Sequence, residues 1–101
     1  MDDSRIQEDL YRAERAKLIL EDPLTVAALA DMKSAIVAQW EASPARDFEG
    51  REALYRYLKT INLFESHFRT HLANGEIAAF QIRDEERRQN WLAKMRAKLP
   101  I

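Results

Sequence analysis

Two histidines four residues apart are the closest approach in this sequence to a catalytic or metal-binding motif. His67 and His71 lie one helical turn apart, so both imidazoles could bind one metal ion. The zinc-peptidase pattern also requires a glutamate directly after the first histidine, and Phe68 occupies that position. No third ligand is indicated, so we predict no metal and no cofactor. The pair is interpreted as partly exposed histidines near a helix C-terminus, where the helix dipole favours protonation.

Other residues that support catalysis occur in unsuitable surroundings. Acid–base chemistry needs two carboxylates in a cleft with separated pKa values, but Glu8, Asp9 and residues 84–86 lie in charge-rich stretches typical of solvated surface. Gly50 and Gly75 are isolated, so there is no glycine-rich phosphate loop. The serines lack the context of an activated nucleophile, and the chain has no cysteine. We therefore predict that the protein is not an enzyme.

The charges balance overall but are unevenly distributed. Sixteen basic and 17 acidic residues give a net charge of −1, which provides no general attraction to nucleic acid or membranes. Residues 2–9 carry four acids and one arginine, whereas residues 83–98 carry six basic and three acidic side chains. This acidic start and basic end could pair within one molecule or between copies. The polar N-terminus does not resemble a signal peptide, and no apolar run approaches the roughly 20 residues of a membrane helix.

The elements that must position these side chains are amphipathic helices. A length of 101 residues indicates one domain. Helices are predicted over residues 3–20, ending near Glu21, then 23–42, 47–75, and from about residue 76 onward. Asp22 and Asp47 are expected to cap the second and third helices, with Pro23 in a first turn and a loop around Pro44. Asn74-Gly75 is predicted to stop the third helix in a left-handed conformation.

The predicted fold is all-α, with three to four helices and an antiparallel hairpin of residues 23–42 and 47–75 as its core. Apolar residues at three- and four-residue steps define the core face of each helix. The predicted core is Val26, Leu29, Ile36, Trp40, Leu54, Leu58, Ile61, Phe68 and Leu72. The nearby aromatic residues Tyr55, Tyr57 and Phe64 are interpreted as packing residues rather than as a base-stacking platform.

The charged C-terminal segment is predicted to project from the bundle. Residues 83–90 (RDEERRQN) contain no apolar side chain over about two turns, whereas a helix lying on its own bundle would keep an apolar face there. We expect a bundle over residues 1–82 and a helical extension over 83–101. Trp91 could be an exposed anchor or could pack on the bundle end. The candidate interaction residues are Arg87, Arg88, Trp91, Leu92, Met95 and Leu99.

Two stretches resemble a known group of proteins. They are Leu20 to Trp40, LEDPLTVAALADMKSAIVAQW, and Ser43 to Phe80, which contains SPARDFEGRE and NGEIA. The order of a D-P-L helix start, a tryptophan before an S-P loop, D-x-E-G-R-E and N-G-E-I-A resembles small uncharacterised helical proteins of tailed bacteriophages and prophages, encoded near head and packaging genes. The resemblance covers residues 18–82, about two-thirds of the chain. It implies a phage setting, in the host cytoplasm or the virion, and no enzymatic activity to carry over.

Together these features predict a non-enzymatic protein that acts through protein–protein interaction. We expect an oligomeric assembly or accessory factor of the phage head and packaging apparatus, whose partner is a second copy or a phage structural or packaging protein. One alternative is a nucleic-acid-binding packaging accessory, although the basic residues of the tail are spread around the helix and interrupted by acids. The other alternative is a small inhibitor of a host protein.

Overall fold

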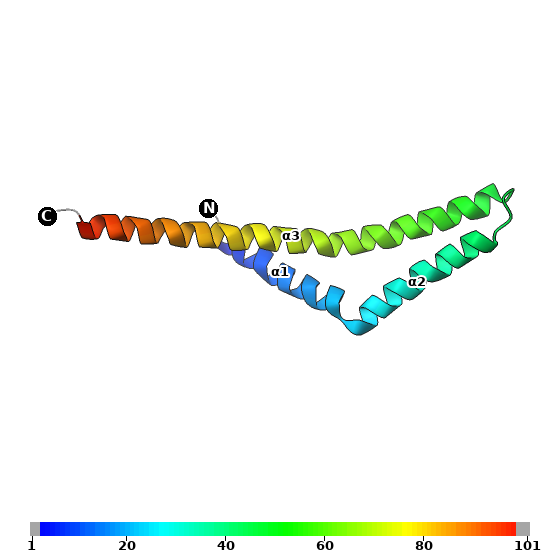
Figure 1. Ribbon diagram of the computed structural model, residues 1–101, viewed down its shortest axis with the longest axis horizontal. Helices are drawn as coiled ribbons and strands as arrows, with labels where there is room; N and C mark the ends of the chain where they lie inside the picture. The colour runs from blue at the N-terminus through cyan, green and yellow to red at the C-terminus, as the bar shows by residue number, and fades with distance from the viewer. Residues whose placement is uncertain (1–2, 99–101) are drawn as a thin grey trace.

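The protein is an elongated arrangement of three helices. The computed structural model describes residues 3–98, with α1 at Asp3–Glu21, α2 at Pro23–Ala42 and α3 at Phe48–Lys98. α3 forms a long rod, and α1 and α2 together make a bent second layer along one side of it (Figure 1). The principal extents are 84 × 26 × 20 Å, and the radius of gyration of 23.0 Å far exceeds the roughly 13 Å of a compact domain of 100 residues. The all-α prediction is confirmed, with three helices among the described residues.

Local side-chain caps explain where α2 and α3 begin. The Thr25 backbone N–H donates to Oδ2 of Asp22 at 3.0 Å, with Pro23 in the first turn. At the next loop the Gly50 N–H donates to Oδ1 of Asp47 at 3.1 Å. Both predicted caps are therefore confirmed, together with the ends of the first two helices.

The predicted helix stop at Asn74-Gly75 is wrong. α3 runs through both residues as one helix of 51 residues, and no glycine within residues 3–98 has a positive φ. Gly75 is buried, and a β-carbon added to it would overlap the β-carbon of Ala13 on α1. The glycine therefore allows two helices to approach closely instead of ending one of them. No separate fourth helix begins at Glu76 in this part of the chain.

α1 packs antiparallel along the middle and C-terminal half of α3, and the most closely packed region lies there (Figure 1). Within residues 3–98 the buried apolar side chains are Ile6, Ala16, Ile61 and Ala78. α2 and α3 do form the antiparallel hairpin, but two of its predicted core residues are open, with Val26 50% and Trp40 47% exposed. α2 diverges from α3 with distance from their connecting loop (Figure 1), so its side chains have no second layer to cover them. Leu29, Ile36, Leu54, Leu58, Phe68 and Leu72 are partly covered, and only Ile61 of the predicted core is buried.

A regular stripe on α3, the inner stripe, faces the other two helices. Its members alternate at steps of four and three residues, and each is buried or partly buried: Leu54, Leu58, Ile61, Glu65, Phe68, Leu72, Gly75, Ala79 and Ile82. This is the heptad spacing of coiled-coil packing. Beyond the start of α1, α3 continues alone toward the C-terminus, so the predicted projection of this charged segment is confirmed (Figure 1). No described helix is long and apolar enough to cross a membrane.

Candidate interaction surface

The histidines lie on the same side of α3 but are not joined by further ligands. His67 is exposed and His71 is partly covered. Across residues 3–98, no three His, Cys, Asp or Glu side chains are grouped so that they could hold a metal ion. The prediction that the pair lies near a helix C-terminus is wrong, because α3 continues to Lys98. That the histidines bind no metal stays a prediction.

The predicted contact residues occupy the projecting end of α3. Trp91 is 60% exposed and Met95 43% exposed, whereas Leu92 is partly covered. Arg87 and Arg88 are exposed one turn before them. Leu99, the sixth predicted contact residue, lies outside the described residues. The open position of Trp91 excludes packing on the end of its own bundle, and its role in binding remains a prediction.

Two further exposed apolar residues precede these on α3 and are missing from the predicted contact set. Ile77 is 57% and Phe80 55% exposed. Ile77 follows the buried Gly75 by two residues, which corresponds to a rotation of about 200° around the helix axis. It therefore faces away from α1. Phe80 lies 11 positions and Ile77 14 positions before Trp91, so the sequence placed all three near one helical face without showing whether that face is buried or exposed.

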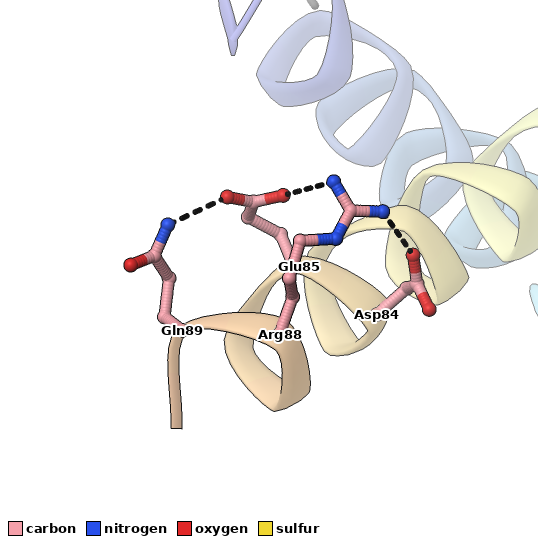
Figure 2. A network of polar contacts seen from close by, with 4 residues as sticks. All are labelled: Asp84, Glu85, Arg88 and Gln89. Carbon is pink, nitrogen blue, oxygen red and sulfur yellow. Dashed lines mark hydrogen bonds and ion pairs between the residues drawn. The ribbon is translucent and has the colours of Figure 1, made fainter. Parts of the chain in front are cut away.

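Between these apolar pairs lies a network of polar side chains. Nη2 of Arg88 is 3.3 Å from Oδ2 of Asp84, and Nη1 is 3.4 Å from Oε2 of Glu85. Gln89 donates through Nε2 to the other Glu85 oxygen at 3.0 Å. Figure 2 shows the Arg88 guanidinium lying between the two carboxylates. Arg88 and Glu85 also border an open hollow of about 500 Å³ where α1 begins. The guanidinium therefore has two acidic partners on its own helix.

A second apolar surface lies where α2 and α3 are joined. Ile36, Val37 and Trp40 of α2 and Leu54, Tyr55 and Leu58 of α3 line a groove of about 380 Å³. The Arg51 guanidinium lies 4.5 Å from the centre of the Trp40 ring, a cation–π contact. The prediction that the aromatic residues of this region are packed is wrong for three of them, because only one helix lies beside α3 here. Tyr55 is 54%, Tyr57 60% and Phe64 52% exposed.

One ion pair connects α2 to α3 near the middle of the rod. Nζ of Lys33 lies 2.5 Å from Oε1 of Glu65, and Nη2 of Arg69 lies 3.6 Å from Oε2. Only 14% of the Glu65 side chain is exposed. The hydrogen bond from Lys33 is the main reason that the pKa of Glu65 lies below its ordinary value of 4.5, and it outweighs the opposing effect of burial. The carboxylate occupies the single charged position of the inner stripe and contacts α2 through Lys33.

The arrangement as a whole offers exposed apolar surface on rigid helices. Within residues 3–98, 17 large apolar side chains are substantially exposed and four apolar residues are buried. A monomer that is stable on its own buries most of its large apolar side chains. Such surfaces bind other proteins by burying apolar area. The chain matches no family model, no curated protein and no solved structure.

Proposed function

We propose that this chain is a non-enzymatic interaction protein: an oligomeric assembly or accessory factor of the head and packaging apparatus of a tailed bacteriophage. It would act in the host cytoplasm or in the virion by binding a second copy or a phage structural or packaging protein. The partner-binding part of this proposal is supported by the surface of the molecule. The phage setting is supported by the D-P-L, D-x-E-G-R-E and N-G-E-I-A motifs of residues 18–82.

The observation that carries the proposal is the accessible surface area. The chain exposes 8415 Å² at a mass of 11.8 kDa. A compact monomer of that mass exposes about 5,900 Å². The excess of about 2,500 Å² is comparable to the total area that a large, stable protein–protein interface buries. A partner that covers the exposed apolar side chains would remove this excess.

A nucleic-acid-binding packaging accessory is the less favoured candidate. The end of α3 is basic in composition, with Arg87, Lys94, Arg96 and Lys98 exposed. However, Arg88 is engaged by Asp84 and Glu85, so acidic groups interrupt the positive surface. A phosphate-binding face would require a more continuous row of free basic side chains.

Light scattering on the full chain tests the proposal. We expect a mass above that of one chain at high micromolar concentration, or a complex with phage head and packaging proteins, reconstituted from purified components. The mass should not change when duplex DNA is added at moderate salt. A monomer that binds none of those proteins contradicts the proposal. DNA binding that weakens steeply with salt would instead favour the nucleic-acid alternative.

A further inference from the structure

One exposed face of α3 has a pattern that is complementary to itself. We define the outer stripe as Ile77, Phe80, Asp84, Arg88, Trp91 and Met95. These residues follow one another at steps of three or four, so they lie along one side of the helix, and that side is opposite to the buried Gly75. Five of the six side chains are exposed, and Asp84 is partly covered close to the hollow where α1 begins. The stripe consists of a charged pair with an apolar pair on each side.

The order of the stripe is nearly the same when it is read in reverse. Ile77 and Met95 are nine positions before and after residue 86, and Asp84 and Arg88 are two positions before and after it. Phe80 and Trp91 lie six positions before and five positions after the same point. When two copies of a helix pack antiparallel about a two-fold axis at that level, each residue meets its counterpart on the other copy. Apolar residues then meet apolar residues, and Asp84 meets Arg88.

We propose that two copies of this chain associate through their outer stripes, with the two α3 helices antiparallel and the two-fold axis at the level of residue 86. This inference rests on the proposed function and names its partner as a second copy. Ile77 packs against Met95 of the second copy, and Phe80 packs against Trp91. The positions of the stripe repeat after 11 residues, a spacing that gives two packed helices a right-handed supercoil.

Charge selects the antiparallel orientation. In that orientation each Arg88 faces Asp84 of the second copy, and the symmetry supplies two such pairs. A parallel pairing in register would place Arg88 against Arg88 and Asp84 against Asp84, which is repulsive. Within one chain the two side chains are exposed and only 3.3 Å apart, so a modest rotamer change lets the guanidinium reach across the interface.

In this dimer the projecting end of α3 covers exposed residues of the second copy. The C-terminal end of α3 extends beyond the start of α1 (Figure 1). Trp91 and Met95 of this end are 60% and 43% exposed. In the antiparallel pair they lie over Ile77 and Phe80 of the second copy, on the face opposite to its α1. The overlap from residue 77 to residue 95 is about 28 Å long. Each copy thus covers the part of the other that its own helices leave open.

Charge reversal tests the inference with the full chain, with mass followed by sedimentation equilibrium. Asp84→Arg places only arginines at the two charged positions, and Arg88→Asp places only aspartates there, so each variant alone should dimerise about tenfold or more weakly. The double variant Asp84→Arg/Arg88→Asp restores opposite charges in the antiparallel pair and should dimerise like the natural chain.

Trp91→Ala should also weaken the dimer about tenfold or more. Leu63→Ala, which removes an equally exposed α3 side chain outside the stripe, should leave dimerisation unchanged.

Cysteine cross-linking fixes the orientation, because the natural sequence contains no cysteine. Ile77→Cys mixed with Met95→Cys should form a disulfide-linked dimer when an oxidant is added, and neither variant should cross-link with itself. Self-cross-linking of Met95→Cys would show a parallel arrangement and overturn the inference. An oligomer that is unaffected by the stripe variants also overturns it, but leaves the proposed function intact. A chain that stays monomeric but binds a head or packaging protein likewise overturns the inference and leaves the proposed function intact. A chain that stays monomeric and binds no head or packaging protein overturns both proposals.

Discussion

Gly75 of α3 lies directly against Ala13 of α1, so closely that a β-carbon on the glycine would overlap the alanine β-carbon. The same added atom would lie 3.7 Å from the Asp9 carbonyl oxygen, at ordinary contact distance. The two helix backbones therefore approach each other at a point where both side chains are minimal. Close helix approach of this kind increases van der Waals contact along the flanking positions, where Ala16 and Ala78 are buried.

Gly75→Val should destabilise the protein. The new side chain must displace Ala13, whose β-carbon is fixed to the α1 backbone and cannot rotate away, and overpacking of this kind costs about 1–3 kcal/mol. Urea unfolding followed by circular dichroism measures the change. Ala73→Val is the matched control, because Ala73 is exposed on the same helix. Equal stabilities of the two variants would mean that α1 does not pack at Gly75.

Truncation of Ile61 separates the buried side of α3 from its open side. Ile61 is 9% exposed and Leu63 is 59% exposed, two residues apart on the same helix. Ile61→Ala should lower the free energy of unfolding by about 2–5 kcal/mol, because it removes buried methyl groups and leaves a cavity. Leu63→Ala should change it by no more than about 0.5 kcal/mol. If the two losses were similar, the inner stripe would not be the packed face.

The extent to which the sequence predicts this fold depends on whether the signal is local. The starts of α2 and α3 were predictable because Asp22 and Asp47 cap them through contacts three residues away. The role of Gly75 was not predictable from its neighbours. The residue that requires a glycine there is Ala13, more than 60 positions earlier in the chain. Asn-Gly is a good local stop signal, and the tertiary contact overrides it.

The candidate surface was predictable only where the signal is local in sequence. The polar interval of residues 83–90 correctly indicated that α3 extends beyond its own bundle. The absence of an apolar face can be read from the sequence of one helix, without knowing where the other helices lie. The exposure of Val26 and Trp40 depends on how far α2 diverges from α3, which no periodicity encodes. Ile77 and Phe80 have the same spacing whether they face inward or outward, so assigning them to the surface required the position of α1.

The Lys33–Glu65 ion pair should make stability depend on pH in the acidic range. The pKa of Glu65 is lowered in the folded protein, so the unfolded chain binds a proton more readily as the pH falls. The stabilisation is therefore complete above the ordinary value of 4.5 and is lost as the pH drops through the lower folded value. Thermal unfolding of the natural chain and of Glu65→Gln should show a difference in Tm that shrinks below that pH.

The exposed pair of Glu8 and Arg12 provides the control for this measurement. The two side chains are 2.5 Å apart but each is 54% exposed, so solvent screens their interaction. At neutral pH, Glu8→Gln should lower the Tm much less than Glu65→Gln does. If Glu65→Gln behaved in the same way, α2 would not be held to α3 by this carboxylate.

Tryptophan fluorescence reports separately on the two apolar surfaces, because the chain has only Trp40 and Trp91. Both indoles are substantially exposed in one chain, at 47% and 60%. In the variant Trp40→Phe the emission comes from Trp91 alone, and it should shift to shorter wavelength as the protein concentration rises and the ring becomes buried against Phe80 of a second copy. In Trp91→Phe the emission of Trp40 should not shift in this way, because the groove beside Arg51 lies at the opposite end of α3 (Figure 1). A concentration-dependent shift of Trp40 with none of Trp91 would locate association at the α2–α3 groove and not at the outer stripe.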